Sequence, residues 1–333
     1  MTFKPEVSVI MANYNGARYL GAAIKSVQMQ SLQHWELILV DDASDDESVE
    51  CAESFARADK RIHIVTTNAN RGPAATRNAA LERASGRWTA IFDSDDIMRP
   101  LRLETLRNRA IEDGAAIVAD DLLVFSDDGR MPRAFLPKRF SAKPRWIGLT
   151  QYVDSNRLYS RMPDLGYLKP FIETDLLRRT GIRYDERLHI GEDYEIMARL
   201  LASGARLRLE PTANYLYRKH PASISHRIHA AQIAALIEAD ERLIDSLGAI
   251  RPDVARAFTR RKNSLNAMLE YDRIVGLIKG RRYAKAAAAA AQTPYIWPLL
   301  GRPIRARLER IFGSHAQSAR TPPPRREARI EAL

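Results

Sequence analysis

The chain has 333 residues, and its 52 lysines and arginines outnumber its 41 aspartates and glutamates, giving a formal net charge of +11. Residues 251–333 hold 18 of the basic and 6 of the acidic residues, so residues 1–250 carry a net charge of −1, which excludes nucleic-acid binding for them. The single cysteine excludes an internal disulfide, and no segment approaches the roughly 20 apolar residues of a membrane span. The first strand follows the N-terminus without a signal-peptide segment, so we expect a cytoplasmic protein.

Short apolar runs alternate with helical patterns in the first 100 residues. The predicted strands are 7–11, 35–40, 61–66 and 88–92, and the predicted helices are 18–28, 48–58 and 74–84. This alternation predicts an α/β fold with a mostly parallel sheet and right-handed crossovers. Three of the strands end in polar residues, and ligands bind outside the carboxyl ends of such strands. The polar ends are therefore expected to share one cleft.

The run that ends at Phe92 leads into three acidic residues within four positions, Asp93, Asp95 and Asp96. Carboxylates crowded at one strand end repel one another, so a fold tolerates them best beside a cation. Hard oxygen ligands suit Mg²⁺ or Mn²⁺, and Mg²⁺ is usually held together with the phosphates of a substrate. The alternative is a solvated acidic turn in which Asp96 caps the next helix.

The C-terminal part is basic and helical. Helical patterns cover 230–247 and 256–278, and an alanine-rich helix follows Gly280. In residues 302–312 the apolar side chains share one face and most arginines lie elsewhere. Such a helix either lies on an anionic membrane surface, with residues about 293–313 as the anchor, or packs on the protein itself. Residues 314–333 are proline-rich and are expected to be disordered.

Six segments together resemble glycosyltransferase family 2. They are Val7–Asn15, Val40–Asp46, Asn70–Asn78, Asp93–Asp96, Gly191–Leu200 and Tyr217–Ser225. The resemblance covers roughly residues 5–226 and implies a GT-A fold, with a Rossmann-like, mostly parallel central sheet flanked by helices, and a nucleotide-sugar donor. We therefore expect a GT-A domain at 1–226, a basic helical extension at 227–313 and a disordered tail at 314–333.

The resemblance also implies roles for the acidic strand end. Asp93 would contact the donor ribose and the metal, and Asp95 would be the principal protein ligand of a Mn²⁺ or Mg²⁺ cofactor. Asp96 would orient the donor sugar or cap the following helix. His220 would be a further contact to the metal or the diphosphate, unless it is structural.

Further donor residues follow from the other motifs. Asp42 would accept a hydrogen bond from the base or the ribose. Asn13, Tyr14 and Asn15 would line the nucleotide site, with Tyr14 either against the base or in the core. Arg77 lies one turn into a helix, where it would meet the donor phosphates unless it is an exposed residue that makes surface ion pairs.

Glu192 and Asp193 open an amphipathic helix. Acids in a first helical turn also compensate the helix dipole, which is the ordinary explanation for them. In the family this Asp is the general base that takes the proton of the acceptor hydroxyl, so the resemblance assigns Asp193 as base and Glu192 as its support. The irregular segment 126–170, which contains Trp146, would form a loop on the acceptor side.

The resemblance as a whole predicts a metal-dependent, inverting hexosyltransferase of surface or exopolysaccharide synthesis. Its donor would be a UDP-sugar, with dTDP- or GDP-sugars next, and its acceptor a polyprenyl-linked or free oligosaccharide. The enzyme would be cytoplasmic, and peripheral on the inner face of the cytoplasmic membrane if the basic helix binds there. A nucleotidyltransferase and a catalytically inactive GT-A-fold scaffold are the alternatives. A dinucleotide oxidoreductase is disfavoured because no Gly-x-Gly-x-x-Gly turn follows the first strand.

Overall fold

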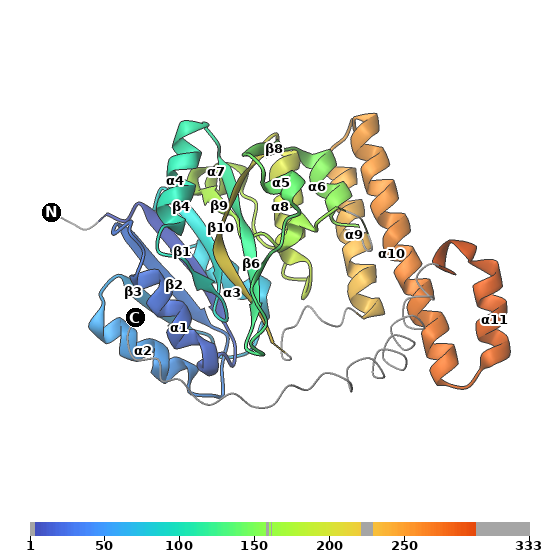
Figure 1. Ribbon diagram of the computed structural model, residues 1–333, viewed down its shortest axis with the longest axis horizontal. Coiled ribbons are helices and arrows are strands. Elements are labelled where there is room, and N and C mark those ends of the chain that lie inside the picture. Colours follow the sequence, from blue (N-terminus) through green and yellow to red (C-terminus); the bar gives the residue numbers. More distant parts are fainter. Residues whose placement is uncertain (1–3, 158–159, 161, 221–228, 298–333) are drawn as a thin grey trace, which may run out of the picture. The chain divides into compact units, whose positions relative to one another are not determined.

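A computed structural model describes residues 4–157, 160, 162–220 and 229–297 (Figure 1). The chain divides into two compact units, Met1–Leu265 and Asn266–Leu333. The first unit reaches well past residue 226, where we expected the catalytic domain to end. Neither the amphipathic segment 302–312 nor the expected disordered tail 314–333 lies within the described residues.

One ten-stranded sheet forms the centre of the first unit, in the order β3-β2-β1-β4-β9-β6-β10-β5, with β7 beside β6 and β8 beside β10. The strands are β1 Val7–Asn13, β2 Trp35–Asp41, β3 Ile62–Thr66, β4 Trp88–Asp93, β5 Ile97–Met98, β6 Ile117–Ser126, β7 Arg133–Ala134, β8 Arg145–Ile147, β9 Phe171–Glu173 and β10 Leu207–Lys219. The first four strands pair in parallel, as predicted. Strand β9 runs antiparallel to both β4 and β6 and joins this half to the parallel pair β6–β10.

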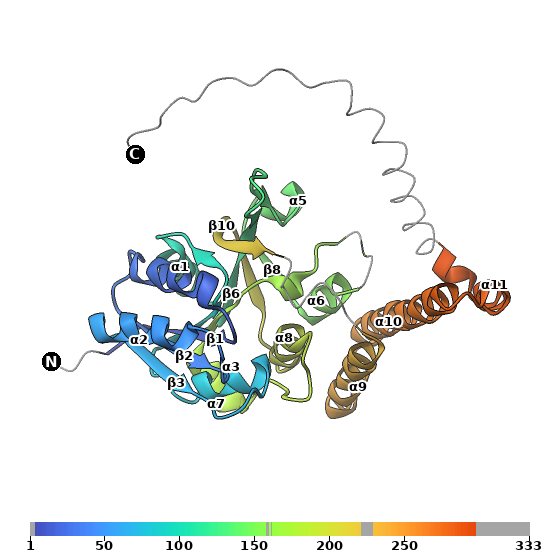
Figure 2. The ribbon, with the colours of Figure 1, turned by 90° about the horizontal axis from the view of Figure 1, so that it is seen from below.

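Helices cover both faces of the sheet. They are α1 Ala17–Gln28, α2 Ser48–Ala58, α3 Pro73–Leu81, α4 Arg102–Glu112, α5 Lys138–Ser141, α6 Leu149–Ser155, α7 Thr174–Thr180 and α8 Glu192–Ala202, with the short 3₁₀ turn η1 at Leu165–Tyr167. Figure 2 shows α1 and α2 on one face of the sheet and α3 on the other. Helix α1 buries Leu20, Ile24 and Val27, which recur at helical spacing. The α/β prediction for this part is therefore confirmed.

Two neighbouring carboxylates on β6 point to opposite sides of the sheet, as strand geometry requires. Asp120 is fully buried and binds the equally buried Arg102 of α4 through both of its oxygens. Asp121 is also buried, and its Oδ1 atom accepts hydrogen bonds from the backbone amides of Leu122 and Leu136, at 2.7 and 2.9 Å. The second contact fixes the chain after β7 to the sheet.

The segment 126–170 is more regular than its sequence indicates, because β7, α5, β8, α6 and η1 all lie within it. Trp146 lies on β8, which pairs with β10, and its ring is covered by the guanidinium groups of Arg206 and Arg208. Trp146 therefore packs against arginines of the same unit.

Two helices beyond residue 228 belong to the first unit in whole or in part, α9 Ala230–Ser246 and α10 Pro252–Lys279. The guanidinium of Arg261, on α10, is 2 % exposed; it pairs with Asp240 of α9 at 2.8 Å and lies 3.8 Å from the ring of Tyr194 on α8. Its Nη1 atom also donates to Asn156, next to α6. One buried arginine therefore ties four segments together.

The second unit contains the end of α10, helix α11 Tyr283–Gln292 and the 3₁₀ turn η3 Pro294–Ile296. Ile274, Ala286, Ala289 and Ile296 form its small core. Trp297 follows, with 57 % of its surface exposed. Among the described residues no helix has both the length and the apolar character needed to cross a membrane.

Candidate active site

The ends of β1, β2 and β4 bring the predicted polar residues together. The parallel register places Asn13 opposite Asp41, and Ala12 opposite Asp93. The Asn13 amide donates to Asp41 at 2.7 Å. The three strand ends therefore form one polar edge, as the sequence predicted.

The three acids that follow β4 are not equivalent. Oxygens of Asp93, Asp95 and Asp96 lie within 4.8 Å of one another, a spacing that a single cation can bridge. Asp96, however, is 1 % exposed, and it accepts hydrogen bonds from the Tyr215 hydroxyl at 2.6 Å and from the Arg218 amide at 2.7 Å. Burial, and then the charges of Asp95 and Asp93, raise the pKa of Asp96 well above its ordinary value.

Asp96 therefore holds the acidic loop to β10. The alternative in which Asp96 caps the next helix is wrong, because α4 begins at Arg102 after Leu101 and has no side-chain cap. Both Asp96 oxygens accept hydrogen bonds from β10.

Asp95 has the most accessible carboxylate of the three, with 34 % of its side chain exposed. Its Oδ2 atom lies 2.9 Å from Nε2 of His220 at the end of β10. Arg218 donates to the Asp95 carbonyl at 2.9 Å, while its guanidinium is sandwiched between the rings of Tyr19 and Phe125. The structure thus places the expected metal ligand Asp95 next to His220, which was expected to contact the metal or the diphosphate. The rest of the His220 motif, residues 221–225, lies outside the described part of the chain.

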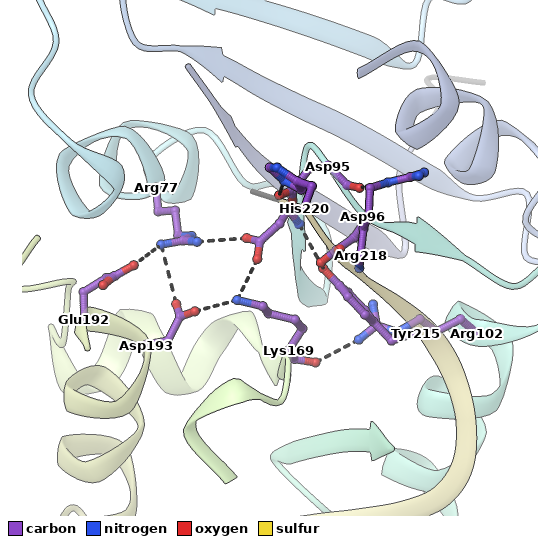
Figure 3. A network of polar contacts seen from close by, with 11 residues as sticks. Arg77, Asp95, Asp96, Arg102, Lys169, Glu192, Asp193, Tyr215, Arg218 and His220 are labelled. Carbon is purple, nitrogen blue, oxygen red and sulfur yellow. Dashed lines mark hydrogen bonds and ion pairs between the residues drawn. The ribbon is translucent and has the colours of Figure 1, made fainter. Parts of the chain in front are cut away.

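Arg77, Lys169, Asp93, Glu192 and Asp193 form a buried ionic cluster, which we call the charge cluster (Figure 3). The Arg77 guanidinium lies 2.9 Å from Asp93, 2.7 Å from Glu192 and 3.6 Å from Asp193. The Lys169 ammonium lies 2.7 Å from both Asp93 and Asp193. The cluster links the loop after β4 directly to the first turn of α8.

The charges of the cluster control its protonation. Burial opposes the ionisation of Asp93, but the adjacent Lys169 and Arg77 outweigh it and hold the pKa of Asp93 well below its usual range. Burial raises the pKa of Glu192, and the charge of Asp193 adds to this shift. Burial also opposes the charge on Lys169, but Asp193 and Asp93 raise its pKa well above the ordinary value.

Arg77 has 7 % of its side chain exposed, so the alternative of an exposed arginine with surface ion pairs is wrong. Its helix α3 begins with Pro73, after Gly72 at φ 86°, a conformation that favours glycine. The Asp42 carboxylate accepts hydrogen bonds from the amides of Arg71 and Gly72 in this turn, at 2.8 to 3.0 Å. In this structure, then, Asp42 shapes the turn that aims Arg77 into the cluster.

The first strand end supplies the remaining predicted donor residues. The Asn15 side chain accepts a hydrogen bond from the Asp45 amide, and the Asn15 backbone amide donates to the Ser44 hydroxyl. These two contacts fix the loop after β2. Tyr14 is 51 % exposed, which excludes the core alternative for its ring. An exposed ring beside this edge is available to pack against a base.

The two oxygens of Asp193 have different surroundings. Oδ2 accepts a hydrogen bond from Lys169 at 2.7 Å. Oδ1 is buried and lies 3.6 Å from the Arg77 guanidinium, but it accepts no hydrogen bond from the described part of the chain. Buried acceptors without a donor are rare, and at a functional site they are expected where a substrate completes the hydrogen bonding. Oδ1 is thus a candidate proton acceptor.

The sequence analysis missed two members of the site, Lys169 and Tyr215. Lys169 lies at the end of the segment assigned to an acceptor-side loop, 24 residues before its partner Asp193. Tyr215 lies on β10, 119 residues after Asp96. Nothing near either residue in the sequence signals its role, because both contacts are made only when β9 and β10 join the sheet.

Comparisons with known proteins give a consistent result. The sequence profile described as Glycosyl transferase family 2 matches residues 8–165. The succinoglycan biosynthesis protein ExoO of Rhizobium meliloti is 36 % identical over 307 residues, which are 92 % of this chain and 87 % of ExoO. ExoU of the same organism, also a succinoglycan biosynthesis protein, is 29 % identical over 300 residues, 89 % of this chain and 85 % of ExoU.

Solved structures share the fold. S. aureus TarS 1–349 in complex with UDP aligns with a TM-score of 0.60 at 21 % identity, covering 82 % of this chain and 74 % of that one. The mannosyltransferase PcManGT from Pyrobaculum calidifontis, in complex with GDP-Man and Mn²⁺, aligns with a TM-score of 0.55 at 18 % identity, covering 92 % and 81 %. The expected GT-A fold is therefore confirmed.

Proposed function

Because this chain belongs to glycosyltransferase family 2, we propose that it transfers a hexose from a UDP-sugar to a polyprenyl-linked oligosaccharide, with inversion at the anomeric carbon. Its relatives ExoO and ExoU are named for succinoglycan biosynthesis, which supports a role in exopolysaccharide synthesis. UDP and UDP-GlcNAc are bound in the TarS structures and GDP-Man in PcManGT, so UDP is our first choice of donor nucleotide.

The observation that carries this proposal is the direct ionic link between Asp93, at the donor strand end, and Asp193, at the start of α8. An inverting transfer needs a carboxylate that removes the acceptor proton while the acceptor oxygen attacks the anomeric carbon. The Oδ1 atom of Asp193, which accepts no hydrogen bond from the described residues, would provide such an acceptor for the proton. Glu192 supports the base indirectly, because it binds the same Arg77 guanidinium.

The residues present fit a divalent cation of the Mn²⁺ or Mg²⁺ type. Asp95 would be its principal ligand, because its oxygen lies within 4.8 Å of an oxygen of Asp93 and its Oδ2 atom lies 2.9 Å from Nε2 of His220. When bound, such an ion neutralises the charge that develops on the leaving diphosphate. Asp96 holds the loop that presents Asp95.

The nucleotide is proposed to bind along the edge formed by β1 and β2. Tyr14 would pack against the base, and Asn13 and Asn15 would line the pocket. Asp42 would contact the base or ribose from the turn that it organises. Arg77 would contact the donor phosphates without leaving the charge cluster, because its buried guanidinium is paired with Asp93.

The basic C-terminal region is proposed to hold the cytoplasmic enzyme at the inner face of the membrane, where polyprenyl-linked acceptors reside. The excess positive charge lies in residues 251–333, and clustered Lys and Arg contribute about 1 kcal/mol each near an anionic surface. The exposed Trp297 is an additional interfacial group.

A donor screen tests the proposal. The purified protein is incubated with Mn²⁺ or Mg²⁺ and with a series of UDP-, dTDP- and GDP-sugars, and release of the nucleoside diphosphate is measured. Diphosphate release from one donor that stops on chelation is expected. Release of pyrophosphate from a nucleoside triphosphate and a sugar phosphate would indicate the nucleotidyltransferase alternative. No turnover with any donor, together with UDP binding, would indicate the inactive scaffold.

A further inference from the structure

We propose that Lys169 is a positioning residue for the base Asp193, and that it acts by sharing its ammonium between Asp193 and the donor-side carboxylate Asp93. This inference rests on the proposed role of Asp193 as the base. The observation that carries it is geometric: one buried ammonium lies 2.7 Å from a carboxylate oxygen of each residue.

Hydrogen bonds hold the backbone at Lys169 and at the residue that follows it. Its carbonyl accepts a hydrogen bond of 2.8 Å from Arg102, which is held by the fully buried Asp120. The carbonyl of the next residue, Pro170, accepts from the amide of Ile91 in β4, two residues before Asp93. Proline also restricts the preceding backbone to extended conformations. The ammonium is therefore aimed from a rigid point, although lysine side chains are ordinarily flexible.

The two cations of the charge cluster, Arg77 and Lys169, differ in the carboxylates that they contact most closely. Arg77 makes its shorter contacts with Asp93 and Glu192 and stays 3.6 Å from Asp193. Lys169 makes no contact with Glu192 among the described residues, but it hydrogen-bonds Oδ2 of Asp193 directly. Lys169 is thus the group that orients the Asp193 carboxylate through Oδ2, while Oδ1 accepts no hydrogen bond and has the Arg77 guanidinium 3.6 Å away.

The charge balance shows what the loss of Lys169 would do. Asp93, Glu192 and Asp193 supply three negative charges, and Arg77 and Lys169 supply two positive ones. Replacing Lys169 by methionine keeps an unbranched side chain only one atom shorter but leaves only one cation for three carboxylates. Because the neighbouring buried carboxylates repel one another and the Lys169 hydrogen bond is gone, Asp193 would lose its orientation. Residues that orient metal ligands typically cost 10- to 100-fold in activity when they are replaced, and by analogy we expect a loss of about that size.

The donor site should respond differently. Removing Lys169 makes the surroundings of Asp93 more negative, so it cannot weaken the attraction of a divalent cation there. Binding of UDP with Mn²⁺, measured by calorimetry, is therefore expected to be as tight in Lys169→Met as in the original protein, or tighter. Damage to the fold would instead weaken binding and slow turnover together.

A double-mutant cycle separates a role through Asp193 from a general structural role. Turnover of the best donor from the screen is measured for Lys169→Met, Asp193→Asn, the double variant and the unaltered protein. If Lys169 acts through Asp193, adding Lys169→Met to Asp193→Asn should lower the rate by less than a factor of about three. The exposed Lys60→Met serves as the matched control and should leave all rates unchanged.

Each other result overturns the proposal. An equal loss from Lys169→Met with and without Asp193 would mean that Lys169 acts elsewhere, while Asp193 would remain the base if its own substitution is inactive. If Asp193→Asn turned over at the rate of the original protein, Asp193 would not be the base, and the proposal for Lys169 would fail with it. Weakened UDP binding would place Lys169 in donor binding. If Lys169→Met does not fold, Lys169→Gln, which keeps hydrogen-bonding capacity without the charge, takes its place in the cycle.

Discussion

The substitution Asp121→Asn is predicted to stabilise the protein at neutral pH. Burial raises the pKa of the Asp121 carboxyl to about 6 from an ordinary value of 3.8, although the amides of Leu136 and Leu122 favour the ionised form. Both amides donate to one oxygen, Oδ1, so an asparagine can accept the same two hydrogen bonds through its carbonyl oxygen. The substitution therefore removes the buried charge and keeps the contacts.

The size and sign of the effect follow from the two pKa values. Below pH 3.8 the carboxyl is protonated in the folded and unfolded chains, and it costs nothing. Between pH 3.8 and 6 the unfolded chain loses its proton first, so the folded state becomes less stable as pH rises. Above pH 6 the cost is constant, at about 3 kcal/mol for a shift of roughly 2 pKa units. That figure is an upper limit, because the neutral asparagine also loses hydration on folding.

Urea unfolding at pH 5, 6, 7 and 8, followed by circular dichroism, measures this effect. The free energy of unfolding of Asp121→Asn should exceed that of the original protein by an amount that grows from pH 5 to pH 7 and then stays level. Asp120→Asn is the matched control on the same strand. It leaves the Arg102 guanidinium buried without its carboxylate, so it should lose about 3 to 5 kcal/mol. A stability for Asp121→Asn equal to or below that of the original protein at every pH would refute the argument.

Three further predictions concern the site and the C-terminal region. Asp95→Asn should lose Mn²⁺-dependent UDP binding in calorimetry with an unchanged melting temperature; unchanged binding would remove Asp95 from the metal site. Asp193→Asn should keep UDP binding and lose transfer by about 10² to 10⁴, the usual contribution of a general base; a wild-type rate would redirect the search to Glu192. The full chain should sediment with anionic liposomes at low salt, and less so as salt screens the attraction. A chain shortened to residues 1–297 should bind less, and equal binding of both chains would exclude residues 298–333 as the anchor.

Much of the donor side of the site could be predicted from the sequence, because strand ends and their motifs are local features. The apolar run before Asp93 and the acids after it placed the loop correctly at the edge of the sheet. The three acids nevertheless look alike in the sequence. Only the tertiary structure distinguishes the exposed Asp95 from the buried Asp96, because the partners of Asp96 come from β10.

The charge cluster could not be predicted for a related reason. Arg77 is a charged residue in a short helix with no strong apolar pattern, so the sequence left an exposed position open as the alternative. Its burial follows from three acids contributed by β4 and α8. Lys169 precedes the antiparallel strand β9, which the parallel βα pattern of the first 100 residues does not announce.

The position of Arg261 limits how this enzyme can be recombined with its relatives. A chimaera that exchanges the segment carrying the six motifs and ends near residue 226 would separate Arg261 and Asp240 from Tyr194, the residue that follows the proposed base. In such a chimaera the Tyr194 ring on α8 would lose the buried guanidinium that covers it, and no other described residue replaces that cation. Specificity grafts between such transferases should therefore carry the chain through Leu265 as one cassette. A junction placed before Leu265 would combine α8 from one protein with α9 and α10 from another, and their buried groups would not be matched.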